Sequence, residues 1–165
     1  MLSQTKIGTL LHEDHMATIE TLQGLEEFLG RNKATPKLDD TAKAFLGHLA
    51  KTLREEVEKH FGFEENHLFP VFIERGETGI VMMLTHEHRV ILPLAVQVAE
   101  LATAAAESGF DAQNWLDFRD AGSELVEREI FHVQKEEMGL LSAISALVAP
   151  DVDARLAETY REVVG

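Results

Sequence analysis

The chain has 165 residues with 15 Lys and Arg against 29 Asp and Glu, a net charge of −14. So acidic a chain repels phosphate backbones and anionic lipids, and we therefore expect neither nucleic acid nor a membrane as a partner. Cysteine is absent, which excludes disulfides, thiolate metal sites and cysteine nucleophiles. No apolar run approaches the roughly 18 residues of a membrane span, and no signal peptide is visible at the N-terminus, so we expect a cytoplasmic protein.

Apolar residues recur at helical spacing through the first half of the chain. This spacing predicts a first helix over about residues 3–30. Residues 31–36 then break the pattern, and a second helix runs over about 39–66. Pro70 ends or kinks this second helix.

The second half of the chain predicts two more long helices. Pro93 lies inside the third and should kink it, unless that boundary is wrong. Asp111 is a suitable N-cap for the fourth. The predicted ranges are about 80–107 for the third helix and 111–148 for the fourth, followed by a short last helix that ends near Val163. The pattern predicts an all-α fold, an antiparallel up-down-up-down four-helix bundle with a short C-terminal helix, forming one domain over 1–165 with a bundle core of about 5–148.

Polar residues interrupt the apolar stripe of every long helix. His15, for example, lies four residues after Leu11 and four before Ile19, and therefore points inward with them. The other residues on inward stripes are His60, Glu64, His88, His132 and Glu136. Isolated buried imidazoles and carboxylates are costly, so the convergence of four His and two Glu favours a metal site.

The spacing of these residues repeats along the chain. His60 and Glu64 form a His-x-x-x-Glu pair, which recurs as His132 and Glu136 in the second half. The separation between His15 and His88 matches the separation between the two pairs to within a single position. We interpret the halves as two copies of one helix pair that bring equivalent ligand sets to the centre of the bundle. Two metals bridged by the carboxylates suit iron better than calcium or magnesium, while manganese and zinc stay open on ligand type.

Several of these motifs together resemble the hemerythrin-like family, also called the HHE cation-binding domain. The resemblance covers about residues 5–145. It is carried by Leu10-Leu11-His12-Glu13-Asp14-His15, His60-x-x-x-Glu64-Glu65-x-x-Leu68-Phe69-Pro70, Thr85-His86-Glu87-His88 and His132-x-x-x-Glu136-Glu137.

The resemblance implies a centre of two iron ions, oxo- or hydroxo-bridged, that meets O2, NO or peroxide. The ligands implied by position are His15, His60, Glu64, His88, His132 and Glu136. Oxygen-carrying hemerythrins place a His-x-x-x-His pair on the third helix, but Leu84 and Leu92 flank His88 here. The chain therefore resembles more closely the bacterial di-iron proteins of nitrosative stress and iron–sulfur repair, although it lacks the Cys-containing domain that some of those carry.

Other polar residues leave alternatives open. His12 and His15 could both reach one metal, and His15 is better centred on the stripe. We expect His86 to face solvent or a neighbouring residue, and His48 and His67 to lie on the surface or beside the ligands. The carboxylates that could hydrogen-bond ligand imidazoles are Glu56, Glu87 and Glu129.

A ferritin-like site is the rival pattern, since Glu64-x-x-His67 and Glu129-x-x-His132 occur with Glu13 and Glu87 available. Its spacing is inconsistent, and it leaves three inward histidines unused. Three classes of function therefore remain: redox chemistry on O2, NO or peroxide, a non-catalytic sensor or carrier of O2, NO or iron, and a metal that only stabilises the bundle. The sequence identifies no catalytic residue, electron donor or protein partner.

Overall fold

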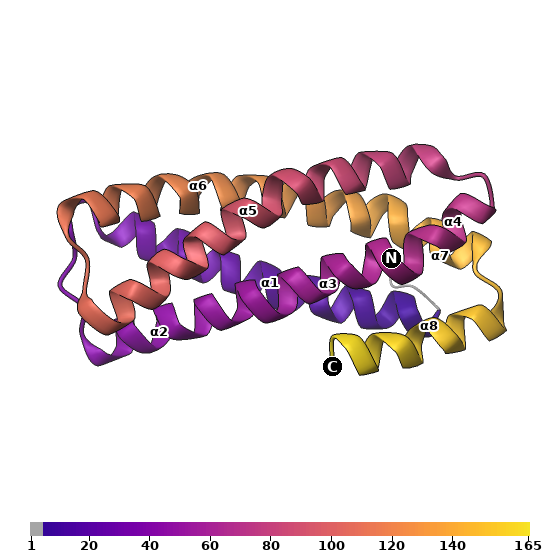
Figure 1. Ribbon diagram of the computed structural model, residues 1–165, viewed down its shortest axis with the longest axis horizontal. Coiled ribbons are helices and arrows are strands. Elements are labelled where there is room, and N and C mark those ends of the chain that lie inside the picture. Colours follow the sequence, from indigo (N-terminus) through magenta and orange to yellow (C-terminus); the bar gives the residue numbers. More distant parts are fainter. Residues whose placement is uncertain (1–4) are drawn as a thin grey trace.

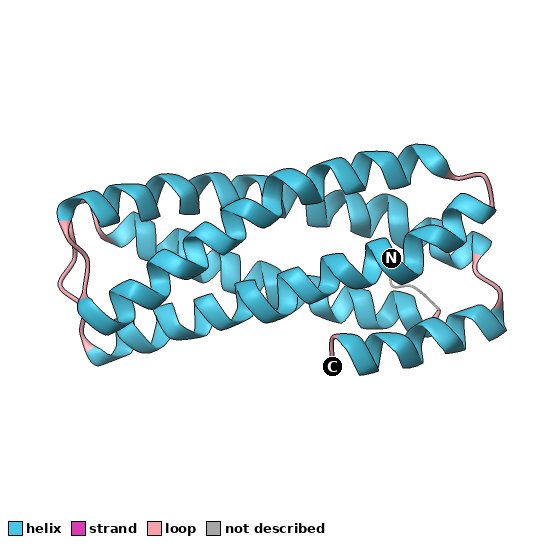
Figure 2. Ribbon diagram, in the orientation of Figure 1, coloured by secondary structure: helices cyan, strands magenta, loops and turns pink. Residues whose placement is uncertain are grey.

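The structure is a computed structural model that describes residues 5–165, apart from the side chain of Glu56. The described part is all-helical and contains no strand. Long helices lie side by side, and loops join them at the two ends of the molecule (Figures 1 and 2). The α-helices are α1 (Lys6–Arg31), α2 (Asp40–Lys51), α3 (Glu58–Phe63), α4 (Phe69–Glu74), α5 (Thr78–Ser108), α6 (Ala112–Lys135), α7 (Leu141–Leu147) and α8 (Pro150–Val163), and the π-helical turns are η1 (Thr52–Val57), η2 (Glu64–Leu68) and η3 (Glu136–Leu140).

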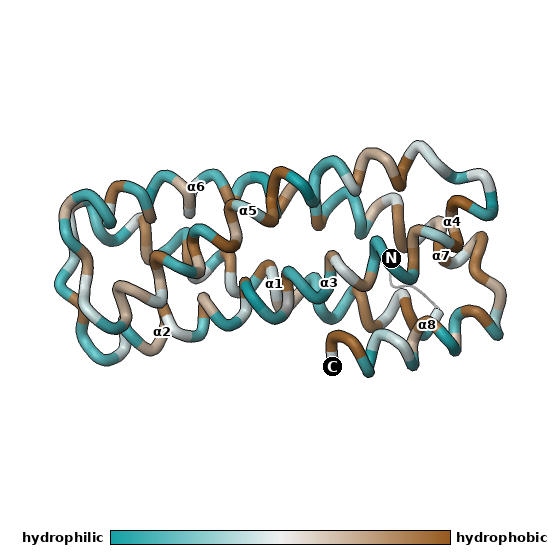
Figure 3. The backbone as a smooth tube through the Cα atoms, viewed as in Figure 1, coloured by the Kyte–Doolittle hydropathy of each residue, from teal (hydrophilic) through white to brown (hydrophobic). Residues whose placement is uncertain are grey.

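The helices pack as a bundle. α2 lies along α5, α5 along α6, and α6 along α1, while α1 also contacts η1 and α8. Apolar and polar stretches alternate along the helices (Figure 3), as an amphipathic pattern requires. α8 folds back beside α1 at the end of the molecule where α1 begins (Figure 1).

Two apolar clusters form the core, and the inward polar residues lie between them. On α1, Leu22 belongs to one cluster and Leu11 to the other, with His15 between them. On α5, His88 lies in the same way between Leu84 and Ile91. The fold therefore surrounds the polar centre with apolar side chains on both sides along the bundle axis.

Helix ends follow the local chemistry of the sequence. Asp111 caps α6 as predicted, because its side chain accepts a hydrogen bond from the backbone N–H of Asn114. Thr5 and Asp39 cap α1 and α2 in the same way. Gly109 ends α5 with φ of 77°, a left-handed conformation that glycine adopts without strain.

One of the predicted helix boundaries needs a correction. The second helix does not end near Asn66 but continues through η1, α3, η2 and α4 to Glu74. Pro70 does not end this run of helix: it lies in the first turn of α4, directly after the π turn η2. The fourth helix covers the expected range with η3 inside it.

The remaining boundaries lie close to the predictions. α5 runs through Pro93 as one helix, and that proline is exposed. α8 begins at Pro150 and ends at Val163. The predicted start of the first helix at Ser3 lies outside the described residues.

One helix among the described residues, α5, is long and apolar enough to cross a membrane by length and composition, with a mean hydropathy of 1.5 in its most apolar stretch. That this helix meets the criterion was not expected from the sequence, because its apolar residues are interrupted by polar ones and form no continuous apolar run. Core helices of soluble bundles meet the same criterion, and α5 packs between α2 and α6.

Candidate metal centre

Six buried residues from different elements meet at the middle of the bundle. They form two groups in which the potential ligand atoms all lie within 4.8 Å of one another. One group contains Glu64, His88, His132 and Glu136, and the other contains His15, His60 and Glu136. The structure thus brings together all six residues that the sequence singled out, and Glu136 belongs to both groups.

The histidines point their Nε2 atoms at the two carboxylates. The Oε1 atom of Glu136 lies 3.2 Å from Nε2 of His15 and 3.2 Å from Nε2 of His132. The Oε1 atom of Glu64 lies 3.4 Å from Nε2 of His60 and 3.3 Å from Nε2 of His88. Each carboxylate therefore lies between two imidazoles from different helices.

These inward atoms are buried and have no hydrogen-bond partner. This holds for Nε2 of all four histidines and for both carboxylate oxygens of Glu64 and Glu136. Buried polar atoms left without partners each cost on the order of 1–3 kcal/mol. A cluster of so many unpartnered lone-pair donors at one place fits a metal site, since cations are the partners that imidazole nitrogens and carboxylate oxygens share.

Each histidine also has a carboxylate at its outer nitrogen. Nδ1 of His60 lies 2.6 Å from Asp14, Nδ1 of His132 lies 2.8 Å from Glu87, and Nδ1 of His88 lies 3.1 Å from Glu65. Nδ1 of His15 is 3.3 Å from Glu137. An imidazole that donates its Nδ1 proton to a carboxylate keeps the Nε2 lone pair free for a metal and holds its ring in a fixed orientation.

The outer carboxylates follow the same repeat as the inner residues. Asp14 and Glu87 directly precede His15 and His88, while Glu65 and Glu137 directly follow Glu64 and Glu136. Each of these carboxylates lies beside the Nδ1 atom of a histidine on a neighbouring helix. Glu87 was expected in this role from the sequence, whereas Asp14, Glu65 and Glu137 were not. The repeated acidic neighbours of the inner residues were the signal that could have found them.

Charge at the centre is balanced by protons in the metal-free chain. Burial lowers the pKa of His15, but the nearby carboxylates of Glu136 and Glu137 outweigh it and raise the pKa to about 9. For His132, burial is likewise outweighed by Glu136, and the pKa rises to about 10. The pKa of Glu136 lies well below its usual value despite burial, because Glu64 and His132 favour its ionised form. Bound cations would replace these protons.

π-helical turns place the two inner carboxylates. η2 begins at Glu64 and η3 begins at Glu136, and each turn is closed by an N–H to the carbonyl five residues earlier, from Phe69 and Leu141 respectively. In an α-helix, residues four apart drift by about 40° around the axis, and the wider π turn reduces this drift. The carboxylate and the leucine four residues later (Leu68 or Leu140) therefore both stay on the buried side.

Residues 7–144 match the hemerythrin HHE cation-binding domain. The chain belongs to the hemerythrin HHE cation-binding domain family. Searches of curated proteins and of solved structures found no match. The HHE domain binds metal cations, and the buried His and Glu groups of this chain are the place where it could hold one.

Other polar residues of this HHE domain lie outside the two groups. His12 is half-buried and its Nδ1 lies 2.7 Å from the Oε1 atom of Glu137, the atom that Nδ1 of His15 also faces. His48, His67 and His86 are exposed, as is Glu13. The exposure of His67 and Glu13 separates two members of the ferritin-like pattern from the centre. The proposed role of Glu56 lies outside the described residues, because its side chain is not described.

Glu129 is a further buried carboxyl on the inner face of α6. It is 3% exposed, and its Oε2 atom has no hydrogen-bond partner. Burial raises its pKa to about 7, although the charge of His132 opposes this shift. It is not in hydrogen-bond contact with a ligand imidazole in the way that Glu87 is. The equivalent position in the first half of the HHE domain, aligned through His60 and His132, is the buried Val57.

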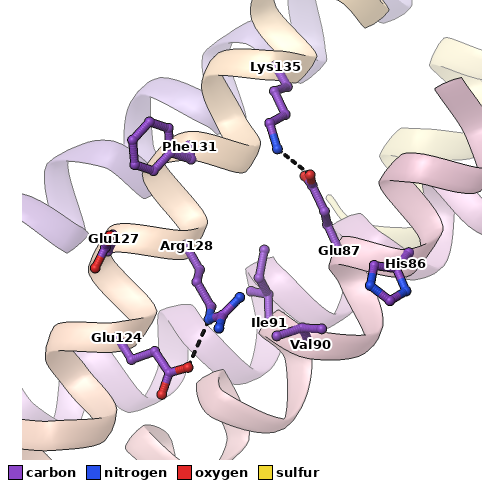
Figure 4. Close-up of a pocket in the computed structure, with 9 residues that line it drawn as sticks. All are labelled: His86, Glu87, Val90, Ile91, Glu124, Glu127, Arg128, Phe131 and Lys135. Atoms are coloured by element: carbon purple, nitrogen blue, oxygen red, sulfur yellow. Dashed lines mark hydrogen bonds and ion pairs between the residues drawn. The ribbon is translucent and has the colours of Figure 1, made fainter.

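A cleft of about 600 Å³ opens on the surface between α5 and α6, beside the His132 side of the centre. Figure 4 shows Glu87 on one wall and Lys135 reaching toward it from the other. A second ion pair, Arg128 with Glu124, lies further along the same cleft. Because Glu87 also contacts His132, this cleft comes within one side chain of the centre. His86 lines it and faces outward, in agreement with the sequence prediction.

Proposed function

We propose that this HHE domain is a non-heme di-iron protein that binds or reacts with O2, NO or peroxide in the oxidative or nitrosative stress response or in iron–sulfur repair. The observation that carries the proposal is the set of unpartnered inward atoms of His15, His60, Glu64, His88, His132 and Glu136. Their arrangement as two groups that share Glu136 supports two adjacent metal positions rather than one.

The donor chemistry supports iron. Mixed imidazole and carboxylate donors suit iron better than calcium or magnesium, which prefer shells of oxygen alone. One position offers four donor residues and the other three, so both leave room for a small ligand. When bound, a di-iron centre supplies redox chemistry toward O2, NO and peroxide.

The protein's own residues orient the donors and keep bulk water away. Asp14, Glu65 and Glu87 hydrogen-bond the outer nitrogens of three imidazole rings and so orient them. Glu137 lies 3.3 Å from the outer nitrogen of the fourth ring, that of His15. Phe61 stacks on His88 with ring centroids 3.8 Å apart, and it belongs to the apolar cluster on that side of the centre. A small uncharged or weakly polar ligand can enter such a site more easily than a large polar substrate can.

Further parts of the proposal come from the sequence expectations. We place the chain as one domain over 1–165, with its long helices in antiparallel up-down-up-down order, and as a cytoplasmic protein without nucleic acid or membrane partners. Its electron donor or protein partner stays unidentified.

A non-catalytic sensor or carrier is the second candidate function. It is favoured by the contact between the centre and the C-terminal helix, where the Tyr160 hydroxyl donates to Asp14, which in turn holds His60. This contact offers a route by which a change at the metal could shift a helix at the surface. Sustained turnover of peroxide or NO would support redox catalysis, whereas stoichiometric binding alone would support the sensor or carrier.

The first test is the metal content and the visible spectrum of the chain produced in iron-replete medium. We expect two iron ions per chain, with near-ultraviolet absorption from the bridged pair that changes when peroxide or NO is added. His60→Ala should lose iron, while His48→Ala, which changes an exposed histidine on the same long helix, should keep it. One zinc ion per chain, or a folded chain that binds no metal, would contradict the proposal.

A further inference from the structure

The two halves of the centre differ in what holds the outer carboxylates. The Oδ2 atom of Asp14 accepts a hydrogen bond of 2.6 Å from the Tyr160 hydroxyl and lies 2.6 Å from Nδ1 of His60. In the other half, the ammonium group of Lys135 donates to Glu87, which holds His132. A repeat that is otherwise closely kept therefore uses a neutral phenol on one side and a cation on the other.

Tyr160 belongs to α8, which lies outside the part of the chain that matches the family. Its side chain is only 6% exposed, and its ring packs edge-on against His60 and Phe63, with centroid distances of 6.5 and 5.1 Å. Tyr160 is the only tyrosine in the chain. Its hydroxyl is therefore built into the surroundings of one ligand histidine by a helix that the family match does not include.

A second anchor holds α8 near its start. The carboxylate of Asp153 accepts hydrogen bonds from the backbone N–H groups of Lys6 and Ile7, at 2.9 and 2.8 Å. These N–H groups belong to the first turn of α1 and have no partner within that helix. α8 is thus fixed to α1 at two points, the N-terminus of α1 and Asp14 about two turns further along.

We infer that α8 is a clamp on one of the two metal positions, with Tyr160 as the residue that positions Asp14 and, through it, His60. This inference rests on the proposed metal binding. The clamped position is the one formed by His15, His60 and Glu136, while Glu64, His88, His132 and Glu136 form the other. The clamped position has one donor residue fewer, so it depends more on the orientation of each.

Loss of the phenol hydroxyl should act on the clamped position alone. Without it, the Asp14 carboxylate keeps His60 as its partner but loses the second group that fixes its direction. Changes in the residues that orient metal ligands typically cost 10–100-fold in metal affinity. Because Tyr160 acts through one intervening residue, we expect the lower end of that range, about tenfold.

The test follows metal release from the whole chain. Wild type and Tyr160→Phe are loaded with ferrous iron without oxygen and mixed with an excess of a coloured iron chelator. Tyr160→Phe keeps the ring that packs on His60 and removes only the hydroxyl. We expect one of its two iron ions to leave about tenfold faster than in wild type, with the rate for the other ion unchanged.

Two further variants separate positioning from general stability. Lys135→Met removes the cation from Glu87. It should increase the release rate of the iron ion whose release Tyr160→Phe leaves unchanged. Asp153→Asn weakens the other contact between α8 and α1 without changing a residue near the metal. It should increase the release rate of the same iron ion as Tyr160→Phe does. If circular dichroism shows that metal-free Tyr160→Phe does not fold, Asp153→Asn is used as the test of the inference instead.

The outcomes are distinct. Release of both ions from Tyr160→Phe at the wild-type rates, or equal acceleration of both, would overturn the clamp and leave the di-iron proposal standing. A wild-type chain that retains fewer than two ions would overturn the di-iron proposal and the clamp with it. Selective acceleration in Tyr160→Phe and Asp153→Asn, with the opposite selectivity in Lys135→Met, would support the inference.

Discussion

Glu129 carries a large electrostatic cost in the metal-free chain, and Glu129→Gln should remove it. The carboxyl is buried and its Oε2 atom has no hydrogen-bond partner. Burial raises its pKa from 4.5 to about 7. Because the folded-state pKa lies above the unfolded one, the folded chain binds this proton more tightly. Stability from this group is therefore complete below the unfolded pKa and is lost as pH rises through the folded pKa.

The magnitude follows from the shift. At about 1.4 kcal/mol per pKa unit, a rise from 4.5 to about 7 corresponds to about 3 kcal/mol of stability lost above neutral pH. Glutamine cannot ionise, so it carries none of this cost. The difference in unfolding free energy between Glu129→Gln and wild type should grow, in favour of the variant, by about 2 to 3 kcal/mol between about pH 5 and about pH 8.

Urea unfolding of the metal-free proteins, followed by circular dichroism at several pH values, measures this difference. Comparing the same pair of proteins across pH cancels the fixed cost of burying the glutamine amide. Glu127→Gln changes an exposed carboxylate on the same helix and should show no such trend. If the difference in unfolding free energy between Glu129→Gln and wild type stays constant across this pH range, the pKa of Glu129 is not raised by burial and this prediction is refuted.

Three further predictions concern the metal, a helix terminus and the core. Glu136→Ala should abolish binding at both metal positions, because Glu136 is common to the two groups; retention of full iron content in elemental analysis would refute this. Asp153→Ala should destabilise the metal-free chain by about 1 kcal/mol in urea unfolding, since it removes the partner of two N–H groups at the start of α1; an unchanged midpoint would show that water replaces it without loss. Phe118→Ala should cost about 3–5 kcal/mol in the same assay, because this fully buried ring packs edge-on against Phe28; a loss below about 1 kcal/mol would mean that the cluster collapses around the cavity.

The sequence by itself determined the helices and the members of the centre. Helical periodicity with few turn residues leaves no alternative to long helices, and a polar residue at a fixed place on an apolar stripe must point into the bundle. The nearly constant separation between the two halves of the repeat then predicted that His15, His60, Glu64, His88, His132 and Glu136 meet, and the structure brings them together. The acidic neighbours Asp14, Glu65 and Glu137 repeat with the same spacing, so their roles were also within reach of the sequence.

Tertiary structure decided the features that depend on contacts between distant elements. Helical periodicity does not distinguish an α turn from a π turn. The sequence therefore did not predict that the second helix passes through the π turn η2 and continues beyond Pro70. His12 and His15 differ in distance to the carboxylates of another helix, which spacing on α1 cannot measure. The contact between Tyr160 and Asp14 joins residues 146 positions apart. No local pattern specifies such a contact, because it depends on how α8 packs against α1.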